Sequence, residues 1–500
     1  MSRSPAHRRR VACRWIGVAL LAVTGCQVGP DFVRPVPPPV PGYRDSVSQS
    51  GLARDNSGPH LAMGQPVPLR WWEALGSSQL NEIIGRAVAS NQTLVAAQAN
   101  LAQAREVLAQ ARGGYYPAVD ASASAERQHV SGTNAQFRTT GNAASLFSVG
   151  ADASYPVDLF GGVRRRVEQE ASLAENAHYQ LAAAYLTVTG NAVTEAITIA
   201  SLREQLQAID DILAADQKNL DLVQLKFEAG KAAQSDLLTA QSQLEADRTL
   251  VPPLSQQLAV ARHALSILVG QFPSEWSPPA FNLEQLALAK ELPVSVPSDL
   301  VHQRPDILAA EAELHAASAA IGVAQSQLYP SLTLSGSLAT QASSAGGLFH
   351  GPSAIWNLLS GVTAPLFHGG TLRAQKRAAV DAYRASFAVY RQTVLSAFQQ
   401  VADVLHALES DNQLVDAQNR ALAISRSSLE LQRLSYNAGK SSLLQLLDAE
   451  RSYNQARLGD AQAVAQRFQD VAQLAVAMGG GWWQAPESER EGWGALTPKA

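Results

Sequence analysis

The chain has 500 residues, 16% of them charged, and its formal net charge at pH 7 is −4. This length could form two or three ordinary domains, and the hydrophobic content is too high for a disordered chain. No basic block of the nucleic-acid-binding type follows the N-terminus. The abundance of Ala, Gln and Ser is typical of helices packed on helices.

The first 25 residues have the composition of a secretory signal peptide. A basic region, residues 8–14, precedes an apolar run, residues 15–23, that is too short for a permanent membrane helix. The run ends in Val-Thr-Gly before Cys26, which resembles the bacterial lipobox. That resemblance makes Cys26 the first residue of a mature lipoprotein carrying acyl chains such as palmitate. The alternative is an ordinary signal peptide followed by a chance cysteine.

The cysteine count agrees with a lipoprotein. Cys13 lies inside the signal and Cys26 at the lipid site, so the expected mature chain has no disulfide and no other thiol. Removing the five arginines of the signal leaves 34 basic and 43 acidic residues, a formal charge of −9. In the lipobox system, Gln27 after the cysteine favours delivery to the outer membrane.

One unit occurs twice, with the copies displaced by roughly 210 residues, as in repeat architectures. Each copy has alternating segments, a Gly pair, a long helical stretch and an aromatic-x-x-Gly-Lys turn. The turn glycines are Gly230 and Gly439. Glycine adopts the left-handed conformation that ends a helix, so we expect each to reverse the chain between antiparallel helices.

The long stretches between these features predict helices of unusual length. Residues 371–438 contain no Gly or Pro, and residues 163–229 contain only Gly190. At 1.5 Å per residue, each would be roughly 100 Å long. Shorter helical patterns at 86–112 and 232–268 would together nearly equal one long helix. In the second long stretch, apolar residues recur at steps of three and four, which is typical of a coiled-coil seam.

Other segments alternate between apolar and polar residues. This pattern is clear at 118–126, 146–157 and 331–338, and less regular at 353–366. Such alternation predicts membrane-spanning barrel strands; the alternative is soluble hairpins packed on one face. Four strands cannot close a water-filled barrel, but three chains supply twelve, so we expect a homotrimer. The polar face, expected to line the lumen, contains Asp120, Ser122, Ser124, Glu126 and Asp152.

The remaining segments are expected to form a peripheral belt, because they are rich in Pro, Gly and Trp and lie at one level of the repeat. The expected organisation is a signal peptide (1–25), an extended equatorial segment (26–80), a first repeat (81–270, with a hairpin at about 118–160), an equatorial linker (271–298), a second repeat (299–478, with a hairpin at about 331–367) and a tail (479–500).

These features together resemble the outer-membrane factors of Gram-negative tripartite efflux pumps, the TolC-like channels, within their OprM-like or NodT lipoprotein branch. The resemblance implies a mainly α fold with a membrane β-barrel portion. Three chains would form a 12-stranded outer-membrane barrel, a 12-helix periplasmic barrel and a mixed equatorial belt. The matching segments are VGPDFVRP (28–35), WWEALGSSQL (71–80), both glycine turns, GGTLRAQ (369–375) and LLQLLDAERS (443–452).

The resemblance implies a passive outer-membrane exit duct for drugs or other small toxic compounds, hence a role in multidrug resistance, and not an enzyme. The implied partners are a periplasmic adaptor and an inner-membrane pump, proton-driven and of the RND type. The ten histidines form no metal motif and no phosphate-binding loop is present, so no cofactor is expected. The alternatives are the duct of a type I protein-secretion system and a periplasmic coiled-coil lipoprotein without a pore.

The resemblance also places a gate at the second turn. The constriction in the lipoprotein branch matches Leu444 and Asp448. Three copies of Asp448 would form an electronegative ring that attracts cations, and three copies of Leu444 a hydrophobic plug. The plain alternatives are an exposed helical aspartate and a seam leucine.

A lock between adjacent helices is implied at Asp236 and Tyr436. The basic partner of the TolC-type lock falls at Ser441, which departs from the pattern, so Lys440 or Lys231 could take its place. Residues 204–247 carry nine acids and three lysines, which predicts either an acidic tip or a solvated helix face.

Overall fold

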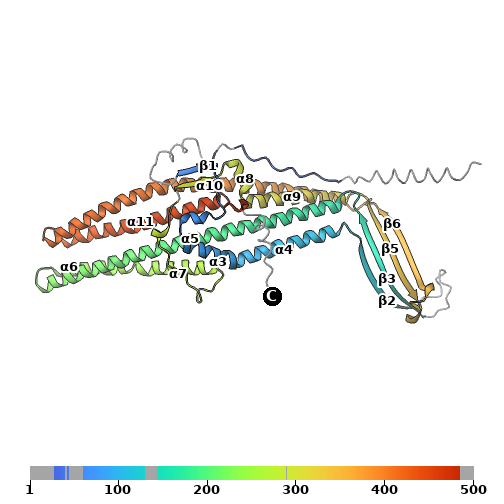
Figure 1. Cartoon of the computed structure of the whole chain (residues 1–500), viewed down its shortest axis with the longest axis horizontal. Coiled ribbons are helices and arrows are strands. Elements are labelled where there is room, and N and C mark those ends of the chain that lie inside the picture. Colours follow the sequence, from blue (N-terminus) through green and yellow to red (C-terminus); the bar gives the residue numbers. More distant parts are fainter. Residues whose placement is uncertain (1–26, 40–41, 44–59, 130–142, 289, 485–500) are drawn as a thin grey trace, which may run out of the picture. The chain divides into compact units, whose positions relative to one another are not determined.

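A computed structural model describes residues 27–39, 42–43, 60–129, 143–288 and 290–484 (Figure 1). The signal peptide, Cys26 and residues 485–500 lie outside the described residues. The chain divides into two compact units. The strand unit comprises the residues up to 35, residues 102–176 and residues 310–390; the helix unit comprises residues 36–101, 177–309 and 391 onward. Each unit combines segments of both sequence repeats.

Helices make up most of the described chain and strands form two sheets (Figure 1). The helices are α3 (Ser78–Ser90), α4 (Gln92–Gly113), α5 (Gly162–Glu228), α6 (Gln234–Arg248), α7 (Val251–Leu268), α8 (Pro297–Gln303), α9 (Pro305–Ser326), α10 (Thr371–Asn437) and α11 (Leu443–Ala477). The strands are β1 (His60–Met63), β2 (Ala118–His129), β3 (Ala143–Val157), β4 (Glu291–Val294), β5 (Ser331–Ala342) and β6 (Ala354–Thr363).

The long helices α5 and α10 each contain 67 residues and are therefore about 100 Å long. Both lie within one residue of the predicted bounds. Glycine pairs before them and Gly230 or Gly439 after them supply the backbone conformations that interrupt a helix. The lengths therefore follow from where the sequence places its helix breakers.

Each of the two shorter predicted helices is divided in two. The break between α3 and α4 lies at Asn91, whose Oδ1 accepts the backbone N–H groups of Thr93 (2.9 Å) and Leu94 (3.2 Å) and so caps α4. The break between α6 and α7 lies just before Pro252 and Pro253, which are tolerated in the first turn of a helix but not in its interior.

The larger sheet, in the strand unit, is antiparallel with the order β2-β3-β5-β6. Its register brings polar residues together on one face. One row crosses all four strands: Asp120, Asp152, Ser337 and Asn357 lie opposite one another in turn. Ser122 Oγ also donates to Asp152 Oδ2 over 3.3 Å. Four of the predicted polar-face residues lie on β2 and the fifth, Asp152, pairs with that face.

The other face of this sheet is apolar. A neighbouring row contains Ala121, Ala151, Leu338 and Trp356. Trp356 is 76% exposed in the single chain. An exposed aromatic side chain of this size is expected on a surface that faces an apolar environment. Strand β6 is less regular than the others, because Ile355 and Leu359 share the face of Asn357.

The helix unit has a continuous apolar core to which α3, α4, α5, α7, α8, α10 and α11 contribute. Ile197, Leu265 and Leu474 are almost completely buried in it. Gly190, the lone glycine of α5, lies where the helix meets α11: a Cβ there would be 2.7 Å from Val476 Cγ2. Close helix approach therefore explains this glycine.

Peripheral segments of the helix unit pack together. Strands β1 and β4 pair in parallel. Tyr43 donates its hydroxyl to the carbonyl of Ser295 (2.9 Å), and Trp482 Nε1 donates to that of Gln303 (2.8 Å). The described parts of residues 36–70 thus meet the linker, and the tail is bonded to Gln303, just beyond the linker. A common belt of all three segments stays a prediction. Residues 27–35 differ from that expectation, because they belong to the strand unit.

Residues 27–35, here called the N-terminal strap, lie along the start of α5. The guanidinium of Arg165 is 2% exposed and donates to the carbonyl of Val28 (3.1 Å) and to the carboxylate of Asp31 (2.6 Å). Val28 N–H donates to the carbonyl of Phe160 (3.1 Å), just before α5. The strap is therefore fixed by both backbone and charge-assisted hydrogen bonds.

Among the described helices, α9 is long and apolar enough to cross a membrane by length and composition. However, 61% of its most apolar window is buried within the chain. Burial of this extent is typical of a packed core helix.

Candidate gate at the helical turns

The turn between α5 and α6 ends α5 with two characteristic hydrogen bonds. Lys231 N–H donates to the carbonyl of Lys226 (2.7 Å), and Gly230 N–H donates to that of Phe227 (2.9 Å). Gly230 has φ +67°. This is a Schellman motif, in which a left-handed glycine satisfies the last carbonyls of the helix.

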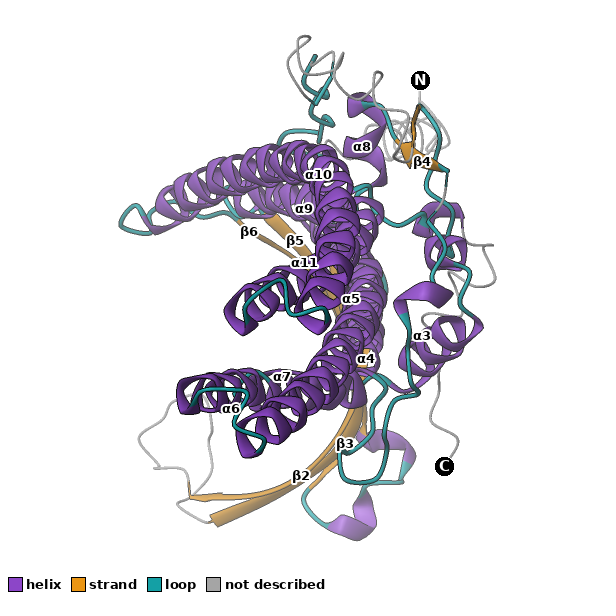
Figure 2. Cartoon of the chain, turned by 90° about the vertical axis from the view of Figure 1, so that its left-hand side faces the viewer, coloured by secondary structure: helices purple, strands orange, loops and turns teal. Residues whose placement is uncertain are grey.

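The turn between α10 and α11 repeats this geometry 209 positions later. Lys440 N–H donates to the carbonyl of Ser435 (2.8 Å), and Gly439 N–H to that of Tyr436 (3.0 Å), with φ +66° at Gly439. Figure 2 shows the two loops, which join α5 to α6 and α10 to α11. The duplicated sequence motif therefore encodes the same backbone turn twice.

The left-handed glycine predicts opposite outcomes for two glycine-to-alanine changes. Gly439→Ala should destabilise the protein by about 1 kcal/mol, because a Cβ disfavours positive φ although space is open around it. Gly85→Ala, inside α3 and equally open, should stabilise by about 0.5–1 kcal/mol. Thermal unfolding in detergent checks both; equal effects would show that φ does not decide the cost.

The return helices begin differently after the two turns. On α11, Ser442 Oγ accepts from Gln445 N–H (3.4 Å) and Gln445 Oε1 accepts from Ser442 N–H (3.0 Å), a complete capping box. On α6, Asp236 Oδ2 accepts the N–H of Ala233 (3.3 Å), which completes only half of that arrangement. The described contacts of Asp236 thus show that it caps α6. Its role in the lock is a separate proposal.

Leu444 and Asp448 lie one helical turn apart and both point away from the packing of their own chain. Leu444 is 67% exposed, whereas its neighbours Leu443 and Leu447 are buried. The Asp448 side chain is 75% exposed and lies 3.7 Å from Arg451, one turn further along α11. This face of α11 is therefore free to meet another molecule, as a gate requires.

Tyr436 is packed between the two hairpins. The Nζ of Lys226 lies 4.0 Å from the centre of its ring, a cation–π contact between α5 and α10. An apolar cluster of Val223, Ala240 and Leu447 surrounds this contact. Tyr436 therefore joins the two turns within one chain.

Within the chain, the cation over the Tyr436 ring is that of Lys226. A role of Lys440 or Lys231 in the lock stays a prediction. Lys226 lies before its turn glycine, where side chains still project from the last helical turn. Lys226 corresponds in the repeat to Ser435, which is next to Tyr436 in the sequence. This correspondence is the sequence signal that could have indicated Lys226. Ser441, at the family position of the basic partner, has a buried Oγ without a hydrogen-bond partner in the described part of the chain.

The contact between Lys226 and Tyr436 predicts a coupling energy. A double-mutant cycle with Lys226→Met and Tyr436→Leu should give about 0.5–1 kcal/mol, measured by thermal unfolding. Tyr436→Phe is the matched control, because it keeps the aromatic face and should retain the coupling. A coupling of zero with Tyr436→Leu would mean that the ring and the ammonium group do not interact.

Polar contacts also connect the two hairpins farther from the turns. Glu450 on α11 is 4% exposed and accepts from Asn219 of α5 (2.7 Å) and Arg433 of α10 (3.2 Å). Arg457 of α11 donates to Asp211 of α5 (2.8 Å). The two hairpins are thus joined by buried as well as exposed charges.

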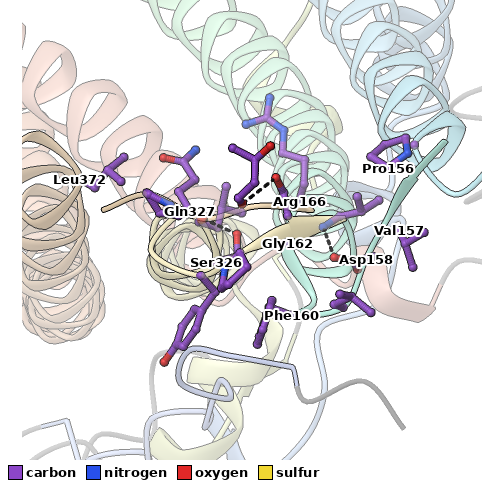
Figure 3. Close-up of a pocket in the computed structure, with 18 of the residues that line it drawn as sticks. Pro156, Val157, Asp158, Phe160, Gly162, Arg166, Ser326, Gln327 and Leu372 are labelled. Carbon is purple, nitrogen blue, oxygen red and sulfur yellow. Dashed lines mark hydrogen bonds between the residues drawn. The ribbon is translucent and has the colours of Figure 1, made fainter. Parts of the chain in front are cut away.

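A pocket of about 670 Å³ lies where the strands of the larger sheet meet the helices (Figure 3). It is lined by residues of α4, α5, α9 and α10 and by strand ends. Pro156, Ser331 and Thr363 line it and lie, by two-residue steps, on the polar face of the sheet. Asp158 at its edge accepts the N–H groups of Val163 (3.1 Å) and Arg164 (3.0 Å), so its charge caps α5.

No grouping of metal-ligating side chains occurs among the described residues. Their acids are instead distributed over hydrogen bonds and ion pairs of the helices.

Comparisons with known proteins agree with this geometry. A family model described as "Outer membrane efflux protein" matches residues 83–271 and 296–480. The pyoverdine export outer membrane protein OpmQ of Pseudomonas aeruginosa is 30% identical over 450 residues, covering 89% of this chain and 94% of that protein. The cation efflux system protein CusC of Escherichia coli O6:H1 is 30% identical, covering 93% and 97%.

A solved structure of the outer-membrane channel OprN superposes with a TM-score of 0.83 at 26% identity, covering 91% of this chain and all of that one. The fold is that of the TolC-like outer-membrane channels. The chain belongs to the outer membrane efflux protein family. Members are trimeric, non-enzymatic exit ducts of tripartite systems, which extend from the outer membrane into the periplasm and work with an adaptor and an inner-membrane pump.

Proposed function

We propose that this exit duct carries drugs or other small toxic compounds, delivered by a proton-driven pump of the RND type. The two relatives named above are equally similar to this chain, yet one is named for pyoverdine export and the other for cation efflux. Equal similarity to proteins of different cargo supports a duct that selects weakly and a pump that selects strongly.

The observation that carries the channel proposal is the two-faced sheet with free edges. Strands β2 and β6 end the sheet, and each has one backbone edge that no other described strand pairs with. In a bilayer such edges must be paired, since lipid offers no hydrogen bonds. Three copies would join β6 of one chain to β2 of the next and close twelve strands around the polar face.

Export assays in a strain without its own efflux duct test this function. The complete three-part system should lower the accumulation of a fluorescent dye, and the duct without its pump should not. Export of a large protein substrate with no effect on dye would favour the type I secretion duct. Absence of any pore in planar bilayers would favour a scaffold lipoprotein instead.

The orientation of the sheet can be tested by cysteine labelling. In proteoliposomes, Ser337→Cys should react with a charged maleimide because its face borders water, whereas Leu338→Cys should react only after detergent is added. Cys26 is common to both variants and cancels in the comparison. Equal labelling of the two neighbouring positions would exclude a membrane-spanning strand.

The gate is proposed to consist of Leu444 and Asp448, with Tyr436 and Asp236 holding the hairpins closed. Exposure of the first pair supports a role between subunits, and the Tyr436 contact supports a role within one subunit. Cys26 is proposed as the lipid-bearing residue, since the residues before it resemble a lipobox.

A further inference from the structure

Each helical hairpin buries an aspartate that the gate does not use. Asp216 on α5 is 3% exposed and Asp411 on α10 is 7% exposed. In both, Oδ2 is completely buried and has no hydrogen-bond donor within the described residues. A buried oxygen without a donor costs free energy, so each of these carboxyl groups needs an explanation.

A second aspartate faces each of them from the return helix. Asp247 of α6 lies at hydrogen-bond range of Asp216, and Asp470 of α11 at the same range of Asp411. Two ionised carboxylates have acceptors only, so they cannot bond to each other. One proton placed between them supplies the missing donor.

The second member of each pair is held in the same way. Gln243 donates to Asp247 Oδ2 (2.9 Å), and Gln466 donates to Asp470 Oδ2 (3.1 Å), in both cases from four positions earlier. This spacing places both side chains on one helix face. The arrangement occurs at different heights, since Asp216 precedes its turn glycine by 14 positions and Asp411 by 28.

We propose that each hairpin is fastened by a proton-bridged carboxyl pair, Asp216 with Asp247 and Asp411 with Asp470, which joins the long helix to its return helix. The O–H of one member donates to the carboxylate of the other. When the proton leaves to water, two negative charges remain side by side, and the helices repel each other.

The surroundings of the first pair favour holding this proton. Burial and the carboxylate of Asp247 raise the pKa of Asp216 to about 8. Glu450 on α11 adds a further negative charge, which Arg433 of α10 partly offsets. Asp211 and Arg457, in the same region, neutralise each other.

The surroundings of the second pair are less acidic. Burial and Asp470 raise the pKa of Asp411 to about 7, while Arg467 of α11 opposes this increase. Arg467 itself faces Asp416 and Asp460 as well. Both pairs should therefore hold a proton near neutral pH and lose it as the pH rises.

The direction of the pH effect follows from these raised pKa values. Between about pH 4 and the folded pKa, the fastened state binds one proton more per pair than the separated state. Each pH unit of increase in that window lowers the ratio of fastened to separated hairpin by about tenfold per pair. The hairpins are therefore most firmly held in acid and loosen as the pH rises towards 8.

Infrared spectroscopy of the complete trimer tests the shared protons directly. At about pH 6 the wild type should show the carbonyl stretch of protonated carboxyl groups, which should disappear as the pH rises through about 7 to 8. Asp411→Asn and Asp216→Asn should each remove part of this band, because an amide can donate in place of the proton. Asp221→Asn is the matched control: Asp221 accepts from Gln217 four positions earlier but is exposed.

A wild-type spectrum without this band at about pH 6, or a band that both asparagine variants leave unchanged, would overturn the proposal. Conductance gives a second readout, which rests on the proposed channel function. It should rise between about pH 6 and pH 9 in the wild type and stay constant in the double asparagine variant. A titrating band with a constant conductance would separate the pairs from the gate, whereas a missing pore would contradict the channel itself.

Discussion

Leu444→Ala combined with Asp448→Ala should raise the conductance of the resting duct and make cells sensitive to vancomycin. If closure buries only one methylene group per Leu444, three copies contribute about 2.4 kcal/mol, which is roughly a fiftyfold change in the ratio of closed to open states. The electronegative ring would disappear as well, so cation selectivity should fall. Single-channel recording in planar bilayers measures both effects.

A matched control exists on the neighbouring helix. Glu430 and Leu434 lie one turn apart on α10, and their exposure, 68% for each, is similar to that of the gate pair. Glu430→Ala with Leu434→Ala should leave the conductance unchanged. If the control raises the conductance as much as the gate variant, any loss at the tips opens the duct and the gate is not located at Leu444 and Asp448.

Arg165→Ala should release the N-terminal strap and destabilise the strand unit. The buried guanidinium is held by Asp31 (2.6 Å) and Glu168 (2.7 Å) as well as by strap carbonyls. Charge-assisted hydrogen bonds contribute about 1.5–3 kcal/mol each, and the exposed carboxylate of Asp31 can return to water. We therefore expect a net loss of about 2–4 kcal/mol.

Limited proteolysis of the strap and thermal unfolding in detergent measure the two parts of this prediction. Arg384→Ala is a suitable control, because its ion pair with Asp381 is exposed and should contribute at most about 0.5 kcal/mol. A strap that resists protease as well in Arg165→Ala as in the wild type would show that its backbone contacts alone hold it.

The long helices and their turns could be predicted because the information is local. Glycine and proline positions bound α5 and α10 to within one residue, and the glycine turns needed only their own conformational freedom. The strands could be predicted because the alternation of apolar and polar residues is visible within a segment of about ten residues. The register of the sheet then aligns the polar face and the apolar face across all four strands.

The contacts between distant segments could not be predicted in this way. Lys226 meets Tyr436 across 210 positions, and Arg165 meets Asp31 across 134. Such pairs depend on how helices pack, and a sequence without its fold gives many equivalent choices. The same limit concealed the buried aspartates, which look like ordinary polar positions of a helix until the return helix places a second acid beside them.

If Cys26 carries lipid as proposed, the N-terminal strap limits the distance between that lipid and the folded protein. Only Gln27 separates Cys26 from the backbone bond that Val28 forms with Phe160. Since an extended residue spans at most about 3.6 Å, acyl chains attached to Cys26 would begin within about 7 Å of that bond. The lipid anchor would then limit how deeply the strand ends can insert into the bilayer, even before a neighbouring chain binds.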